Sequence, residues 1–184
     1  MVTASDLQPF CDSISSNLSR PWTRGGYTYA TNGHVMVRVP ALADVDDNPD
    51  APDAAAIFEK YFKADDPKIL DWSRVPTPKT QEINCPDCDG TGFEHECPRC
   101  DCACEECDGT GVVTNGKINW VQVRGIQFSS KYLLMLRRLP GLKMCSPGAP
   151  EEAQGFVFDG GEALLMPLLA RDRPDVNLDA EAAA

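Results

Sequence analysis

Apolar residues near the start of the chain follow the spacing of a helix. The positions that share this 3.6-residue period are Leu7, Phe10, Cys11, Ile14 and Leu18. They predict an amphipathic helix over residues 5–19. A capping box of Ser5 and Gln8 suits its first turn, Pro9 offers a start slightly later, and Pro21 ends it.

The next segment alternates apolar and polar residues with the two-residue period of a strand. The alternation runs through His34, Val35, Met36, Val37, Arg38 and Val39. Asn32-Gly33 just before it is a strong signal for a two-residue turn. Residues 27–31 and 34–39 are therefore predicted to form a hairpin that buries its valine face.

The second half of the chain repeats this plan of a helix combined with hairpins. Residues 117–128 resemble a strand that Gly125 interrupts, and a helix over 131–139 follows from a cap at Ser129 or Ser130. The remaining predicted elements are a short helix around 57–62, strands over 69–75 and 142–145, and a hairpin of 155–158 with 162–166.

These elements predict an α+β fold of antiparallel sheets with two main helices. The 184 residues, 42% of them hydrophobic, suit one domain with an insertion. We expect a discontinuous body of residues 1–80 and 112–170, whose two parts pack together because neither alone has enough apolar surface. Residues 81–111 form the insertion, and a polar tail over 171–184 is expected to be flexible.

The insertion contains seven of the nine cysteines of the chain. Its two ends, CPDCDGTG and CEECDGTG, are nearly the same, and the cysteines in them are Cys85, Cys88, Cys104 and Cys107. Their C-x2-C-x15-C-x2-C spacing is typical of a zinc site, because two such pairs complete a tetrahedron. The glycines after each pair allow a tight turn that directs amides at sulfur.

Two other uses of these cysteines fit the sequence less well. Disulfides form in oxidising compartments, but no secretory signal segment opens the sequence, and Cys11 and Cys145 stand far from the cluster. A redox C-x-x-C site is normally a single pair beside a βαβ unit. We therefore predict zinc binding in a reducing cytoplasm.

The repeat C-x-x-C-x-G-x-G resembles the cysteine-rich, zinc-binding domain of DnaJ-type chaperones, over residues 85–111 alone. That family binds two zinc ions with four repeats and pairs the first repeat with the last. The middle of this segment lacks Gly-x-Gly, but it supplies enough ligands for a second ion. Those ligands would be His95, Cys97, Cys100 and Cys102. No J-domain motif is present in the sequence, so a chaperone role is not implied.

A second resemblance concerns the body. Residues 27–34, 128–141 and 155–169 are similar to segments of a domain of the bacterial sliding clamp, the DNA polymerase III beta subunit. A clamp domain consists of two βαβββ halves with the helices on one face, so the resemblance implies this fold. A clamp ring contains six such domains, and this chain is long enough for one.

The net charge of −11 argues against broad adhesion to nucleic acid or to anionic membranes. No apolar run reaches the ~18 residues of a membrane span. The basic residues on a predicted helix and its exit are Lys131, Arg137, Arg138 and Lys143. Their contact with nucleic acid would be to phosphate, weak and salt-dependent, and the alternative is a solvated helix face.

Together these features predict a non-enzymatic, zinc-binding interaction module. We expect it to bind a protein partner, to derive from a phage or mobile element, and to serve DNA replication or nucleic-acid metabolism. A zinc-dependent hydrolase is the competing interpretation, although catalytic zinc keeps an open coordination position and thiolate-rich sites are closed. An acidic mimic of DNA, or a competitor at a clamp partner's site, is the third.

Overall fold

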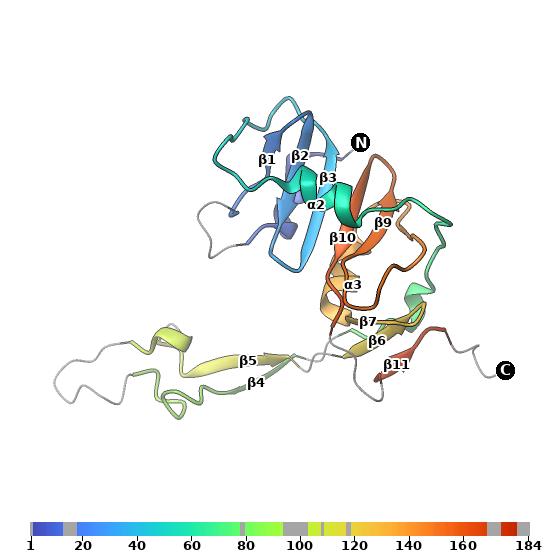
Figure 1. Cartoon of the computed structure of the whole chain (residues 1–184). Helices are drawn as coiled ribbons and strands as arrows, with labels where there is room; N and C mark the ends of the chain where they lie inside the picture. The colour runs from blue at the N-terminus through green and yellow to red at the C-terminus, as the bar shows by residue number, and fades with distance from the viewer. Residues whose placement is uncertain are drawn as a thin grey trace. The chain divides into compact units, whose positions relative to one another are not determined.

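The computed structural model describes residues 2–12, 18–77, 80–93, 103–107, 109–116, 119–168 and 174–179 (Figure 1). The chain divides into two compact units. Residues Met1–Thr77 and Asn119–Ala184 form the first, which we call the body, and Pro78–Ile118 form the second, which we call the cysteine unit. Short helices and mostly antiparallel sheets confirm the predicted α+β class.

A six-stranded antiparallel sheet is the framework of the body. From edge to edge its strands are β1 (Trp22–Arg24), β2 (Tyr27–Thr31), β3 (Val35–Pro40), β10 (Gly161–Leu165), β9 (Gln154–Phe158) and β8 (Lys143–Met144). The central pair, β3 with β10, joins strands from either side of the cysteine unit in the sequence, with Val37 opposite Ala163. The strand order is symmetrical about this pair, because each half contributes one hairpin and one outer strand.

The β2–β3 hairpin turns one residue later than the sequence predicts. Thr31 pairs with Met36, so Gly33 and His34 are the central turn residues, not Asn32 and Gly33. Asn32 instead accepts, through Oδ1, hydrogen bonds of 3.0 Å from the amides of His34 and Val35. Gly33 supplies the left-handed φ of +83° that the turn requires.

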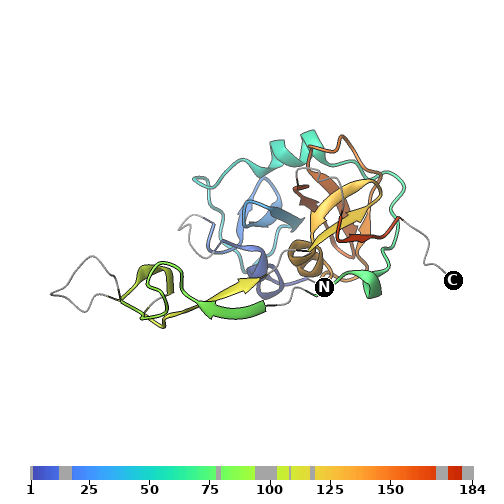
Figure 2. The same ribbon diagram turned by 90° about the horizontal axis from the view of Figure 1, so that it is seen from below.

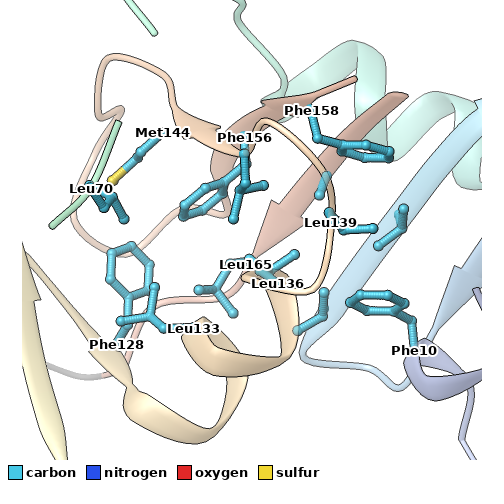
Figure 3. Packing of buried hydrophobic residues seen from close by; sticks show 14 of the residues in the cluster. Phe10, Leu70, Phe128, Leu133, Leu136, Leu139, Met144, Phe156, Phe158 and Leu165 are labelled. Carbon is cyan, nitrogen blue, oxygen red and sulfur yellow. The ribbon is translucent and has the colours of Figure 1, made fainter. Parts of the chain in front are cut away.

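Short helices cover the valine face of this sheet. They are α1 (Ala4–Leu7), the 3₁₀ turn η1 (Gln8–Phe10) and α3 (Ser130–Leu136). Figure 3 shows Phe10, Leu133 and Leu136 in one group of side chains with Phe156 and Leu165 of the sheet, and all five side chains are buried. This apolar cluster joins the two halves of the body into one core.

The first helix is much shorter than the predicted span of 5–19. Its capping box is formed by Thr3 and Asp6, and regular structure ends at Phe10. Pro9 has no amide to continue the helical ladder, and Cys11 is already extended, with ψ of 155°. The helical spacing of apolar residues therefore extends past Phe10, where the regular structure ends. The part of the predicted helix over residues 13–17 lies outside the described ranges.

Helix α2 (Ala54–Tyr61) covers the opposite face of the sheet, as Figure 2 shows, and confirms the predicted short helix. Phe58 of this helix is fully buried and packs with Trp22 and Tyr29 of the sheet. Arg38 of β3 lies with its guanidinium carbon 4.2 Å from the centre of the Phe58 ring. The same side chain donates a 2.6 Å hydrogen bond to Glu162 on β10, which fixes the central strand pair.

The predicted strand over residues 69–75 is wrong. Lys68 makes a single antiparallel bridge to Met144, after which Ile69 is 74% exposed. Asp71 accepts the amide of Ser73 at 3.1 Å and starts the 3₁₀ turn η2 (Trp72–Arg74). An aspartate that caps a turn outcompetes the strand propensity of neighbouring apolar residues.

The predicted strand over 117–128 is a hairpin. β6 (Trp120–Val123) and β7 (Ile126–Ser129) pair antiparallel around Arg124 and Gly125, whose φ values are +50° and +81°. A third strand, β11 (Val176–Asn177), pairs parallel with β6. Residues 174–179 are therefore docked on the body, in contrast to the flexible tail expected from residue 171, because their apolar side chains contact the core.

Candidate metal centre

A two-stranded hairpin stem carries the cysteines in the cysteine unit. β4 (Thr80–Asn84) pairs antiparallel with β5 (Val112–Gly116), with Asn84 opposite Val112. Cys85 directly follows the first strand, and Gly111 directly precedes the second. The two C-x-x-C-x-G-x-G repeats are thus brought face to face; we call each repeat a knuckle.

The four sulfur atoms lie at the spacing of ligands around one metal ion. Cys85 Sγ is 3.8 Å from Cys104 Sγ, and Cys88 Sγ is 3.8 Å from Cys107 Sγ. All four sulfurs lie within 4.8 Å of one another, and all four side chains are buried. A tetrahedron with Zn–S bonds of ~2.3 Å has sulfur–sulfur edges of about 3.8 Å, whereas a disulfide requires ~2.05 Å.

Backbone amides support the second sulfur of each knuckle. The Gly92 amide donates to Cys88 Sγ at 3.2 Å, and the Gly111 amide donates to Cys107 Sγ at 3.3 Å. Both glycines have a left-handed φ, +80° and +75°. The predicted use of these glycines, to turn the backbone and direct amides at sulfur, is confirmed.

The two knuckles are also hydrogen-bonded to each other with internal two-fold symmetry. The Cys85 amide donates to the Gly111 carbonyl at 2.9 Å, and the Cys104 amide donates to the Gly92 carbonyl at 2.9 Å. Equivalent positions in the repeats therefore make equivalent bonds. The near-identity of the two sequences follows from this symmetry, because each knuckle performs the same structural task.

The threonine of each knuckle has a role that sequence reasoning missed. Thr91 Oγ1 donates to the Cys88 carbonyl at 2.8 Å, and Thr110 Oγ1 donates to the Cys107 carbonyl at 2.7 Å. Each hydroxyl therefore closes the turn that contains the second cysteine. The sequence could have indicated this role, because threonine occupies the same position in both repeats.

Burial in this cluster opposes ionisation of the thiols. Desolvation raises the pKa of Cys85, and it raises the pKa of Cys104 to about 12. At Cys88, desolvation is outweighed by hydrogen bonds from the Gly92 amide and from Cys85, and the pKa is lowered to about 6. The protein alone therefore stabilises the Cys88 thiolate, whereas a bound cation would be needed to hold Cys85 and Cys104 deprotonated.

The donor set fits a closed, thiolate-rich metal site such as structural zinc. The four sulfurs lie close enough together to bind one ion, so the protein can supply all four ligands of a tetrahedral site. The residues expected to bind a second ion, His95, Cys97, Cys100 and Cys102, all lie outside the described residues. Of the expected ligands, the structure brings together the four outer cysteines.

The basic residues considered for nucleic-acid contact are spread over different elements of the body. Lys131 lies on α3, but the helix ends at Leu136, so Arg137 and Arg138 lie in the following turn and not on the helix as predicted. Lys143 lies on β8. Arg138 and Asp6 both line a shallow pocket of about 280 Å³, which places a carboxylate in the same pocket as one of these cations.

No family model matches this chain, and neither the curated proteins nor the solved structures include a significant match. Within the described ranges, no helix combines the length and apolar character that crossing a membrane demands.

Proposed function

We propose that this protein is a non-enzymatic interaction module whose binding surface is shaped by zinc. The four-cysteine cluster fits a metal-binding module. In the proposal, zinc binds Cys85, Cys88, Cys104 and Cys107 and holds the two knuckles in one conformation. The knuckles then present a rigid surface to a protein partner in a reducing cytoplasm.

The observation that carries this proposal is the closed donor set. Four buried sulfurs lie within 4.8 Å of one another, and two of them accept hydrogen bonds from backbone amides. A catalytic zinc keeps a position for water or substrate, usually beside histidine or carboxylate ligands. A site closed by four thiolates favours a structural use of the metal over hydrolysis.

We further propose that the module serves nucleic-acid metabolism and has a phage or mobile-element origin. The support is the clamp-like sequence segments and the order β7, α3, β8, β9, β10 in the second half, a βαβββ arrangement. The first half supplies α1, β1, β2 and β3 in the same order. Because the net charge is −11, recruitment to DNA would depend on the partner more than on direct contact.

Capture of partners from a cell lysate tests the proposal. The full-length protein is compared with a variant carrying Cys88→Ser and Cys107→Ser, and Cys11→Ser serves as a control that removes a thiol of the body. The partner should be retained by wild type and control and lost by the double variant. Retention by the double variant, or zinc-dependent turnover of ester, peptide or phosphoester substrates, would contradict the proposal.

A further inference from the structure

Residues 174–179, which we call the strap, are held on the body in the way that a bound peptide is held. The strap is an added strand: Val176 pairs with Val121 of β6, and the Leu178 amide donates to the Gln122 carbonyl at 2.8 Å. The pairing is parallel and short. Backbone bonds of this kind hold a segment to a strand edge without regard to its side chains.

Two carboxylates, four residues apart, anchor the ends of the strap. Asp175 Oδ2 accepts the Trp120 amide at 2.8 Å. Asp179 accepts the amides of both Arg124 and Gly125, the latter at 2.7 Å. The left-handed conformations of these two turn residues direct both amides to one carboxylate, as in an anion-binding nest.

The residues between the two carboxylates contact the body through their side chains and through their main chain. Val176 and Leu178, at alternate positions, pack against the apolar core. On the main chain, Arg74 Nη2 donates to the Asn177 carbonyl at 2.7 Å, and Nη1 donates to the Leu178 carbonyl at 3.4 Å. The strap is thus recognised as an extended segment with the pattern Asp-apolar-x-apolar-Asp.

The surface that receives the strap is built from other parts of the chain. β6 pairs with β7 along its other edge through four residue pairs, from Trp120 with Ser129 to Val123 with Ile126. Val121 and Val123 are fully buried in the core, and Arg74 belongs to η2. β6 is therefore held by β7 and by the core, independently of the strap. The strap adds two half-buried apolar side chains, Val176 and Leu178, to the body.

We propose that this edge of β6 is a peptide-binding groove for a partner protein and that the strap fills it in cis. The ligand is an extended peptide in which two carboxylates flank two apolar residues at alternate positions. The strap acts as a tethered competitor, so it lowers the apparent affinity of the partner's peptide until it is displaced. The proposal concerns the body and is independent of metal binding.

Fluorescence polarisation with a labelled peptide tests the groove in the full-length protein. The probe is Pro-Asp-Val-Asn-Leu-Asp, the sequence of residues 174–179. Replacing Asp175→Ala and Asp179→Ala in the protein weakens the strap and leaves the groove unchanged. We expect this variant to bind the probe at least tenfold more tightly than wild type, and a probe lacking both carboxylates not to bind.

Two further variants make the result specific. Asp44→Ala with Glu59→Ala removes the same charge from exposed positions away from the strap and should leave probe binding as in wild type. Adding Arg74→Ala to the strap variant should weaken the probe severalfold, because two donors to its main chain are lost. No probe binding to the folded strap variant overturns the proposal, and so does equal binding to all variants.

Hydrogen exchange of the wild-type protein tests the same proposal without substitutions. The Leu178 amide should exchange through local opening, faster than the amides that pair β6 with β7. If the strap and the hairpin exchange together, or if the strap variant loses its folded signal, the strap is an integral part of the core and not an exchangeable ligand.

Discussion

Gly92 and Gly111 determine how closely the two knuckles of the metal centre approach each other. A Cβ atom on Gly92 would lie 2.4 Å from the Gly109 carbonyl oxygen, and one on Gly111 would lie 2.3 Å from the Gly90 carbonyl oxygen. Gly109 has nearly the same φ, +76°, yet its added Cβ would first meet Ala103 Cβ at 3.1 Å. A side chain at any of these three glycines would therefore strain the backbone. Only at Gly92 and Gly111 would it also clash with a backbone carbonyl.

Gly111→Ala should weaken zinc binding at least tenfold more than Gly109→Ala. Both substitutions add the strain of an L-residue at positive φ, but the first also separates the knuckles and displaces the amide that supports Cys107. Competition with a chelator of known affinity measures the difference. Equal losses for the two variants would show that the close approach of the knuckles does not matter.

The individual metal ligands could be predicted from the sequence, because each pair of cysteines lies within four residues and has the spacing of a zinc-binding motif. Two residues between cysteines and a repeated Gly-x-Gly already define a knuckle. The bonds between the knuckles could not be predicted in the same way. Cys85 and Gly111 are far apart in sequence, and their contact depends on the pairing of β4 with β5.

The β2–β3 hairpin shows how a single side chain sets the geometry of an element. Asn32 replaces a backbone acceptor at the turn, since its Oδ1 accepts the amides of both His34 and Val35. β3 continues from this turn to the centre of the six-stranded sheet. The turn therefore contributes to the register of the strand that joins the two halves of the body.

Asn32→Ala should lower the free energy of unfolding by about 1–2 kcal/mol, because two amides lose their acceptor. Asn32→Asp keeps an acceptor oxygen at the same place and should cost less than half as much. Urea denaturation of both variants measures the difference. Equal destabilisation would mean that the amide donor of Asn32, not its Oδ1, is what the turn requires.

The hairpins could be predicted from alternation and turn residues, whereas two other elements could not. Apolar periodicity extended the first helix to residue 19, but Pro9 and the extended Cys11 end it. Apolar residues around Ile69 suggested a strand, but a side-chain cap from Asp71 forms a turn there. In both cases a local backbone constraint overrode the pattern of hydrophobicity, as expected when propensities are weak.

Each edge of the six-stranded sheet is hydrogen-bonded to another segment of the same chain. At β1, the Thr23 amide donates to the Asp46 carbonyl at 3.1 Å, and the Asn48 amide donates to the Thr23 carbonyl at 3.0 Å. At β8, Lys68 and Met144 exchange two backbone hydrogen bonds of 2.8 and 2.9 Å. A covered edge cannot add a strand from a second molecule.

We therefore expect the protein to be a monomer at micromolar concentrations. A ring assembled through sheet edges would require the segment around Asp46 or Lys68 to leave its place. Size-exclusion chromatography with light scattering should give a mass near 20.1 kDa. A stable dimer or higher assembly would show that an edge is released or that another surface associates.

The two units should respond differently to removal of metal. Among the described residues of the cysteine unit, the buried cluster consists of the four cysteines with Val113 packed against it. The body has a large apolar cluster of its own. Chelation should therefore accelerate hydrogen exchange over residues 80–116 and leave the body protected. Global unfolding on chelation would contradict this modular arrangement.

Metal content measured on matched variants tests whether the four outer cysteines bind zinc. Purified wild-type protein and the variant with Cys88→Ser and Cys107→Ser are analysed for zinc, and the wild-type thiols are checked by mass spectrometry. A single zinc at Cys85, Cys88, Cys104 and Cys107 predicts that the variant contains one zinc per chain fewer than wild type. Equal zinc in both proteins, or zinc-free wild type with these cysteines in disulfides, would show that they do not form a zinc site.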